Sequence, residues 1–121
     1  MRYSFSEEWT EKARGLARQL QFDHIDLGRI ACVQSTGTKT RRIIARIHTL
    51  GKVMQLGMAQ KPFYVIELIS ERFGKMQPEE QTKTLIHELL HIPHSFGGGF
   101  RHHKPYVNNK TVEEAFRKLG I

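Results

Sequence analysis

The sequence has little cysteine, no long apolar run and few aromatic residues. Cys32 is the only cysteine, which excludes an internal disulfide framework and is typical of a protein in a reducing cytoplasm. No apolar stretch approaches the roughly 18 residues that a membrane-spanning helix needs. The N-terminus also lacks the basic and apolar regions of a secretory signal. We therefore expect a cytoplasmic protein with no membrane partner.

The composition is that of one globular domain with an excess of basic residues. The 121 residues are 39% hydrophobic and 26% charged, and 19 Lys and Arg against 12 Asp and Glu give a net charge of +7. The densest basic cluster is Lys39, Arg41, Arg42 and Arg46. Such a cluster can attract nucleic acid. However, no aromatic residue lies within it to stack on bases, and no nucleic-acid motif is present, which favours a solvated basic surface.

Three segments carry the spacing or the end signals of helices. Residues 6–21 form an amphipathic pattern that begins at Ser6, a suitable N-cap residue. Pro78, followed by two glutamates, begins a second helix that we expect to run to about Ile92, where another proline follows. Residues 109–119 close the chain with a third amphipathic helix.

Strands are expected between these helices. Residues 25–34 alternate in polarity, and residues 62–69 are rich in aromatic and β-branched side chains. Pro62 favours an edge position for the second strand, where an extended peptide could add by β-augmentation. Residues 41–50 are either the hairpin partner of the first strand or part of a helix that continues to Met58, and periodicity leaves both possibilities open. The predicted fold is a single α+β domain over residues 1–121.

Residues 87–91 read His-Glu-Leu-Leu-His and fall on the second predicted helix. His87 and His91 are one turn apart on the same face, so both imidazoles can reach one metal ion. Apolar residues occupy the opposite face. Glu88 lies beside the histidines, where it can act as a general base. The pattern therefore predicts a zinc site and hydrolysis of a peptide bond by a metal-activated water.

A catalytic zinc site needs a third protein ligand and an open position for water. The metzincin spacing requires a glycine at position 94 and a histidine at position 97, and His94 and Gly97 exclude it. The glycines at 97–99 can form a turn that brings the following segment back over the helix. The remaining candidates for the third ligand are His94, His102, His103, Glu113 and Glu114.

The sequence HELLHIP, followed by a glycine-containing loop and then RHHKPYV, resembles a family of small predicted metallopeptidases of archaea and phages. The resemblance extends from about Arg29 to Val107, and a more distant similarity is to SprT-like proteases. It implies a zincin-like fold and makes His103 the third ligand, because residues 101–103 match the Arg-x-His of the family. Lys104 stands where family members often have an acidic residue, so His102 stays an alternative as a ligand or a neighbour of the site.

Two further residues and two further functions remain open at this point. Arg101 and Tyr106 lie close to the third ligand in sequence, where they could stabilise an oxyanion or simply form a salt bridge and a packing contact. The alternative to a peptidase is a basic DNA- or protein-binding module with a structural zinc, held by four protein ligands. A DNA-associated protease of the SprT-like kind would combine both activities. The expected partner is a peptide or protein substrate.

Overall fold

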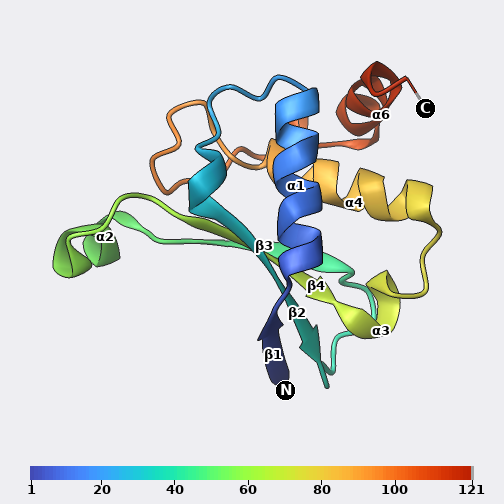
Figure 1. Ribbon diagram of the computed structural model, residues 1–121, viewed down its shortest axis with the longest axis horizontal. Coiled ribbons are helices and arrows are strands. Elements are labelled where there is room, and N and C mark those ends of the chain that lie inside the picture. The colour runs from blue at the N-terminus through green and yellow to red at the C-terminus, as the bar shows by residue number, and fades with distance from the viewer. Residues whose placement is uncertain (121) are drawn as a thin grey trace.

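A four-stranded mixed sheet forms the framework of the computed structural model, which describes residues 1–120 (Figure 1). The strands are β1 (Arg2–Phe5), β2 (Ile30–Thr36), β3 (Ala45–Thr49) and β4 (Tyr64–Ile69). Their order in the sheet is β1-β2-β4-β3, with β2 parallel to β4 and the other neighbouring pairs antiparallel. β1 and β3 are therefore the two edge strands.

Two of the three longer helices pack against one face of this sheet, and the third packs on one of those two (Figure 1). The helices are α1 (Glu7–Gln19), α2 (Lys52–Met58), α3 (Ser70–Phe73), α4 (Pro78–Leu90), α5 (His103–Tyr106) and α6 (Asn109–Lys118), with a 3₁₀ turn at Leu27–Arg29. α1 and α4 pack on the strands, and α6 packs against α4. No helix among residues 1–120 has both the length and the apolar character needed to cross a membrane.

The hydrophobic core lies between this sheet face and the three helices α1, α4 and α6. Alternate residues of the central strands point inward, as the two-residue period of a strand requires. The inward residues of the sheet are Ile30, Cys32, Tyr64, Ile66 and Leu68, and α4 contributes Leu85, Ile86 and Leu89. The apolar face of α4 is thus buried in the core, and its other face is available for the candidate site.

The predicted α+β fold and its three helices are confirmed. The Ser6 side chain caps α1 by accepting a hydrogen bond from the Trp9 amide at 3.1 Å. α4 begins at Pro78 as expected and ends at Leu90, with His91 as its C-cap residue in a helical conformation. α6 is capped by Asn108.

The predicted order of the strands is wrong in two respects. Residues 62–69 do not form an edge strand, because β4 lies between β2 and β3. Pro62 precedes the first strand residue, Tyr64, so its missing N–H costs the sheet no hydrogen bond. Residues 41–50 are not a hairpin partner of β2, because β3 pairs with β4 instead. An edge for an added peptide is therefore offered by β1 or β3 and not by β4.

The remaining differences concern the ends of elements and one short strand. β2 begins only at Ile30, after the 3₁₀ turn, and not at residue 25. The two interpretations of residues 41–58 each hold for a part, since a strand and the helix α2 follow one another there. β1 was not expected, because its four residues are all exposed and carry no alternation in burial. Pairing with β2 is what makes it a strand.

Candidate metal centre

Three histidines from two segments meet at the C-terminal end of α4. One ligand nitrogen each of His87, His91 and His103 lies within 4.8 Å of the others. The ring centroids are 5.1 Å apart for His87 and His91, and 4.7 Å apart for His91 and His103. No other group of three or more potential ligands has such spacing among residues 1–120. The sequence-predicted pair and the third histidine implied by the resemblance are therefore brought together.

A backbone contact fixes the orientation of His91. Its Nδ1 lies 2.9 Å from the carbonyl oxygen of Arg101, and the Arg101 amide donates to the His91 carbonyl at 2.7 Å. Since a carbonyl only accepts, Nδ1 carries the proton and Nε2 keeps its lone pair. A histidine that donates its other ring nitrogen to a carbonyl is the usual arrangement around a protein-bound metal.

Burial favours the neutral form of two of these imidazoles, those of His87 and His91. It lowers the pKa of His87 to about 4, with a further lowering from the neighbouring His91 and His103. The pKa of His91 is also lowered by burial, although the Arg101 carbonyl acts in the opposite direction. Neutral imidazoles offer lone pairs to a cation, so His87 and His91 are in the form that can bind a metal ion.

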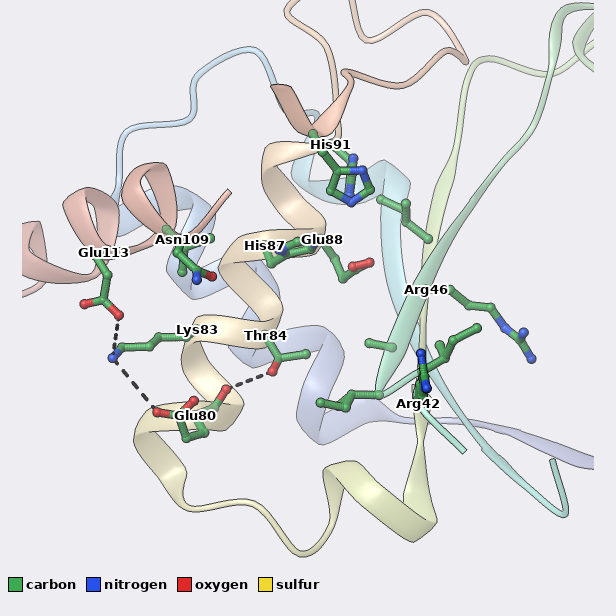
Figure 2. A pocket seen from close by; sticks show the side chains of 16 residues that line it. Arg42, Arg46, Glu80, Lys83, Thr84, His87, Glu88, His91, Asn109 and Glu113 are labelled. Atoms are coloured by element: carbon green, nitrogen blue, oxygen red, sulfur yellow. Dashed lines mark hydrogen bonds and ion pairs between the residues drawn. The ribbon is translucent and has the colours of Figure 1, made fainter. Parts of the chain in front are cut away.

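Glu88 is a buried carboxylate beside this cluster. Its side chain is 5% exposed, and burial raises its pKa to about 7. Among residues 1–120 no donor forms a hydrogen bond to its carboxylate oxygens. In Figure 2 it projects from α4 towards the strand that carries Arg46. A carboxylate with a pKa near neutral pH is suited to take and release a proton.

The segment that returns His103 is held by two side chains that the sequence analysis missed. The hydroxyl of Tyr64 on β4 donates to the Gly99 carbonyl at 2.8 Å and accepts from the Gly98 amide at 3.0 Å. The Gln55 amide donates to the Gly97 carbonyl at 3.0 Å. The sequence signal that could have revealed the role of Tyr64 is a tyrosine within a strand expected to be buried, because a buried hydroxyl needs hydrogen-bond partners.

Glycine is required at one point of this loop. Gly98 has φ +105°, and a Cβ there would lie 2.8 Å from the Leu50 carbonyl. The prediction that the glycines at 97–99 form the return turn thus has a specific physical basis at this position.

The histidines and Glu88 lie in a cleft of about 900 Å³. One wall is the segment from Arg42 to Ile47, which includes the outer edge of β3, and the opposite wall comes from α6 (Figure 2). α4 lies between them, with Lys83 ion-paired to Glu113 at 2.8 Å across the junction of α4 and α6. The cleft is therefore bounded by an unpaired strand edge on one side and a helix on the other.

The other candidate residues lie outside the histidine cluster. The His94 ring stacks against His24 with centroids 4.3 Å apart. Exposed His102 is the N-cap of α5, and Glu113 pairs with Lys83. Glu114 lies with Arg101 and Tyr106 in a separate depression.

Arg101 and Tyr106 contact each other and do not face the cleft. The Arg101 guanidinium lies 4.1 Å from the centre of the Tyr106 ring, a cation–π contact. Of the two outcomes left open from sequence, the geometry thus agrees with a packing contact. The contribution of Arg101 to the site is its backbone, which holds His91.

These features define an α+β protein with a candidate three-histidine metal centre beside a buried glutamate. Residues 1–117 match the sequence model of the family described as putative phage metallopeptidase, and the chain belongs to this family. No curated protein and no solved structure matches the chain significantly. The family implies a metal ion and a peptide or protein substrate, in keeping with the three neighbouring histidines.

Proposed function

We propose that this protein is a zinc-dependent peptidase, in which His87, His91 and His103 bind zinc and Glu88 is the general base. The observation that carries the proposal is the approach of three imidazole nitrogens to within 4.8 Å of one another, beside a carboxylate without a hydrogen-bond partner among residues 1–120. Membership of the metallopeptidase family supports the same reaction.

The number of ligands favours catalysis over a structural role. Structural zinc sites are closed by four protein ligands, whereas catalytic sites keep one position for water. Among residues 1–120 the cluster offers three ligands, and neither His94 nor Glu114 belongs to it. These three histidines would hold the zinc ion, which would supply Lewis acidity and lower the pKa of a water molecule at the open position.

Glu88 supplies the proton transfer. As a carboxylate it takes a proton from the attacking water, and as a carboxylic acid it then gives that proton to the nitrogen of the leaving amine. Burial without partners makes it a stronger base than an exposed glutamate, since no hydrogen bond stabilises its charged form.

The free edge of β3 replaces residues 62–69 as the proposed docking strand for the substrate. It borders the cleft that contains the histidines, and within residues 1–120 no strand pairs with its outward backbone groups. An extended peptide lying there would form main-chain hydrogen bonds to β3 while its scissile bond lies over α4.

The test is the zinc content of the purified protein, measured by mass spectrometry for the wild type and three variants. We expect about one zinc per chain in the wild type, His102→Ala and Glu114→Ala, and loss of the metal in His103→Ala alone. His102→Ala is the matched control, since it removes the adjacent imidazole. Loss of zinc in Glu114→Ala, or retention in His103→Ala, would contradict the proposed ligand set.

A further inference from the structure

Helix α2 (Lys52–Met58) exposes its apolar side chains and buries a polar one. The exposed fractions are 82% for Val53, 54% for Met54, 81% for Leu56 and 53% for Met58, whereas Gln55 is 8% exposed. A surface helix of a globular protein normally turns its apolar face towards the core. A contiguous apolar surface left in solvent marks a site of interaction.

This inverted helix is firmly held. The buried Gln55 amide donates to the Leu50 carbonyl at 2.7 Å and to the Gly97 carbonyl at 3.0 Å. Figure 1 shows α2 at the tip of an arm between β3 and β4, away from α1, α4 and α6. Its apolar side chains therefore project from a fixed support and are free of contact with the main core.

The arm belongs to the part of the chain that carries its net charge. From residue 27 to residue 66 there is no Asp or Glu and there are seven Lys or Arg, which equals the net charge of +7 of the whole chain. Lys52 begins α2 and Lys61 follows it shortly. Arg29 is fastened beside them, with its Nη2 donating to the Lys61 carbonyl at 2.6 Å. The apolar tip is thus flanked by cations.

We propose that α2 anchors the protein to the surface of a membrane that contains anionic lipid. Val53 and Leu56, with the two methionines, would enter the boundary between headgroups and acyl chains, and Lys52 and Lys61 would meet the headgroup charges. The absence of acidic residues from the arm removes repulsion. The sequence-based expectation of no membrane partner rested on the lack of a spanning segment, which an interfacial helix does not need.

Lipid fits this surface better than nucleic acid does. Stacking on bases requires aromatic side chains, and α2 has none, since its exposed apolar side chains are those of Val53, Leu56 and two methionines. Contact with acyl chains is non-directional and suits such a surface. With a single short helix the binding is expected to be reversible and to weaken as salt screens the lysines.

The experiment is sedimentation with vesicles of phosphatidylcholine alone or mixed with phosphatidylserine. The wild type should bind the mixed vesicles, and the double variant Val53→Ser/Leu56→Ser should lower the partition coefficient about tenfold or more, because two apolar side chains no longer enter the lipid. The matched control is Tyr3→Ser/Phe5→Ser on β1, whose side chains are 62% and 64% exposed. Its partition coefficient should equal that of the wild type.

Charge is tested by Lys52→Gln/Lys61→Gln, which should weaken binding to the mixed vesicles roughly tenfold. The proposal is overturned if the wild type does not bind the mixed vesicles at low salt, or if it binds phosphatidylcholine vesicles equally well. It is also overturned if the β1 control variant loses as much binding as Val53→Ser/Leu56→Ser does. It is also overturned if a single-stranded oligonucleotide binds the arm, with an affinity that falls in Val53→Ser/Leu56→Ser. Vesicle binding should persist in His103→Ala, which separates this inference from the proposed peptidase.

Discussion

Glu67 and Glu88 are two buried glutamates with opposite electrostatic environments. Glu67 on β4 is 1% exposed on the sheet face turned away from the core, where it accepts hydrogen bonds from Arg46 at 2.9 Å and Ser35 at 2.6 Å and contacts His48 at 2.8 Å. Burial alone would raise its pKa, but the hydrogen bonds from Arg46, Ser35 and His48 lower it to about 2. The pKa of Glu88, which has burial alone, is raised to about 7.

The difference separates a structural carboxylate from one available for chemistry. Glu67 is ionised at neutral pH and joins β2, β3 and β4 through its partners. Glu88 is also buried, at 5% exposed, but among residues 1–120 no donor forms a hydrogen bond that would stabilise its charged form. Unfavourable burial of this kind concentrates at functional sites, where a carboxylate must be free to bind a proton.

Replacement of the unpartnered glutamate should have the largest effect. We expect Glu88→Gln to lower kcat for peptide hydrolysis by about 10²–10⁴-fold, because the amide cannot accept the proton. The zinc content should stay unchanged. The free energy of unfolding should stay unchanged or rise, because the substitution removes no hydrogen bond. Cleavage of a peptide mixture followed by mass spectrometry gives the rate. Full activity in Glu88→Gln would show that another group is the base.

The partnered glutamate should instead control acid stability. The folded-state pKa of about 2 lies below the ordinary value of 4.5, so Glu67 stabilises the fold above pH 4.5 and loses this contribution as the pH falls towards 2. The loss amounts to at most about 3 kcal/mol, because solvent screens the partly exposed partners Arg46 and His48. Urea unfolding across this range should show it in the wild type and not in Glu67→Gln. Parallel curves for the two proteins would contradict the assignment.

A smaller effect is expected on the inward face of the same strand. Tyr64→Phe removes the hydroxyl that joins Gly98 and Gly99 to β4 and should lower the free energy of unfolding by about 1–2 kcal/mol. Because this loop leads to His103, zinc affinity should fall as well, whereas Glu67→Gln should leave it unchanged. Competition with a chelator measures the affinity. Equal zinc affinity in Tyr64→Phe and the wild type would show that the contacts of this loop with Tyr64 do not affect metal binding.

Much of the candidate site was predictable because it lies within one helix. The positions of His87, Glu88 and His91 relative to one another follow from helical geometry, and Pro78 marks where that helix begins. His103 was one of five candidates for the third ligand, and only the family resemblance selected it, since the 11 residues between it and His91 include a loop. The sequence of a loop does not by itself specify the position at which the following residue lies relative to a distant helix.

The strand order was beyond prediction for a related reason. β3 and β4 have suitable residues for strands, but pairing depends on contacts between distant segments and not on local preference. Pro62 suggested an edge because proline cannot donate in a ladder. The structure avoids that cost by starting β4 two residues later.

The sequence by itself determined the helix with its His-Glu-His face, the α+β class and the acid-free basic segment, because helical period and charge are local properties. The tertiary structure alone decided which strand edge borders the cleft, that α2 exposes its apolar residues, and that Glu67 and Glu88 have contrasting pKa values. Two glutamates have the same ordinary pKa, and only the donors that the fold brings to each one, or withholds from it, can make them differ.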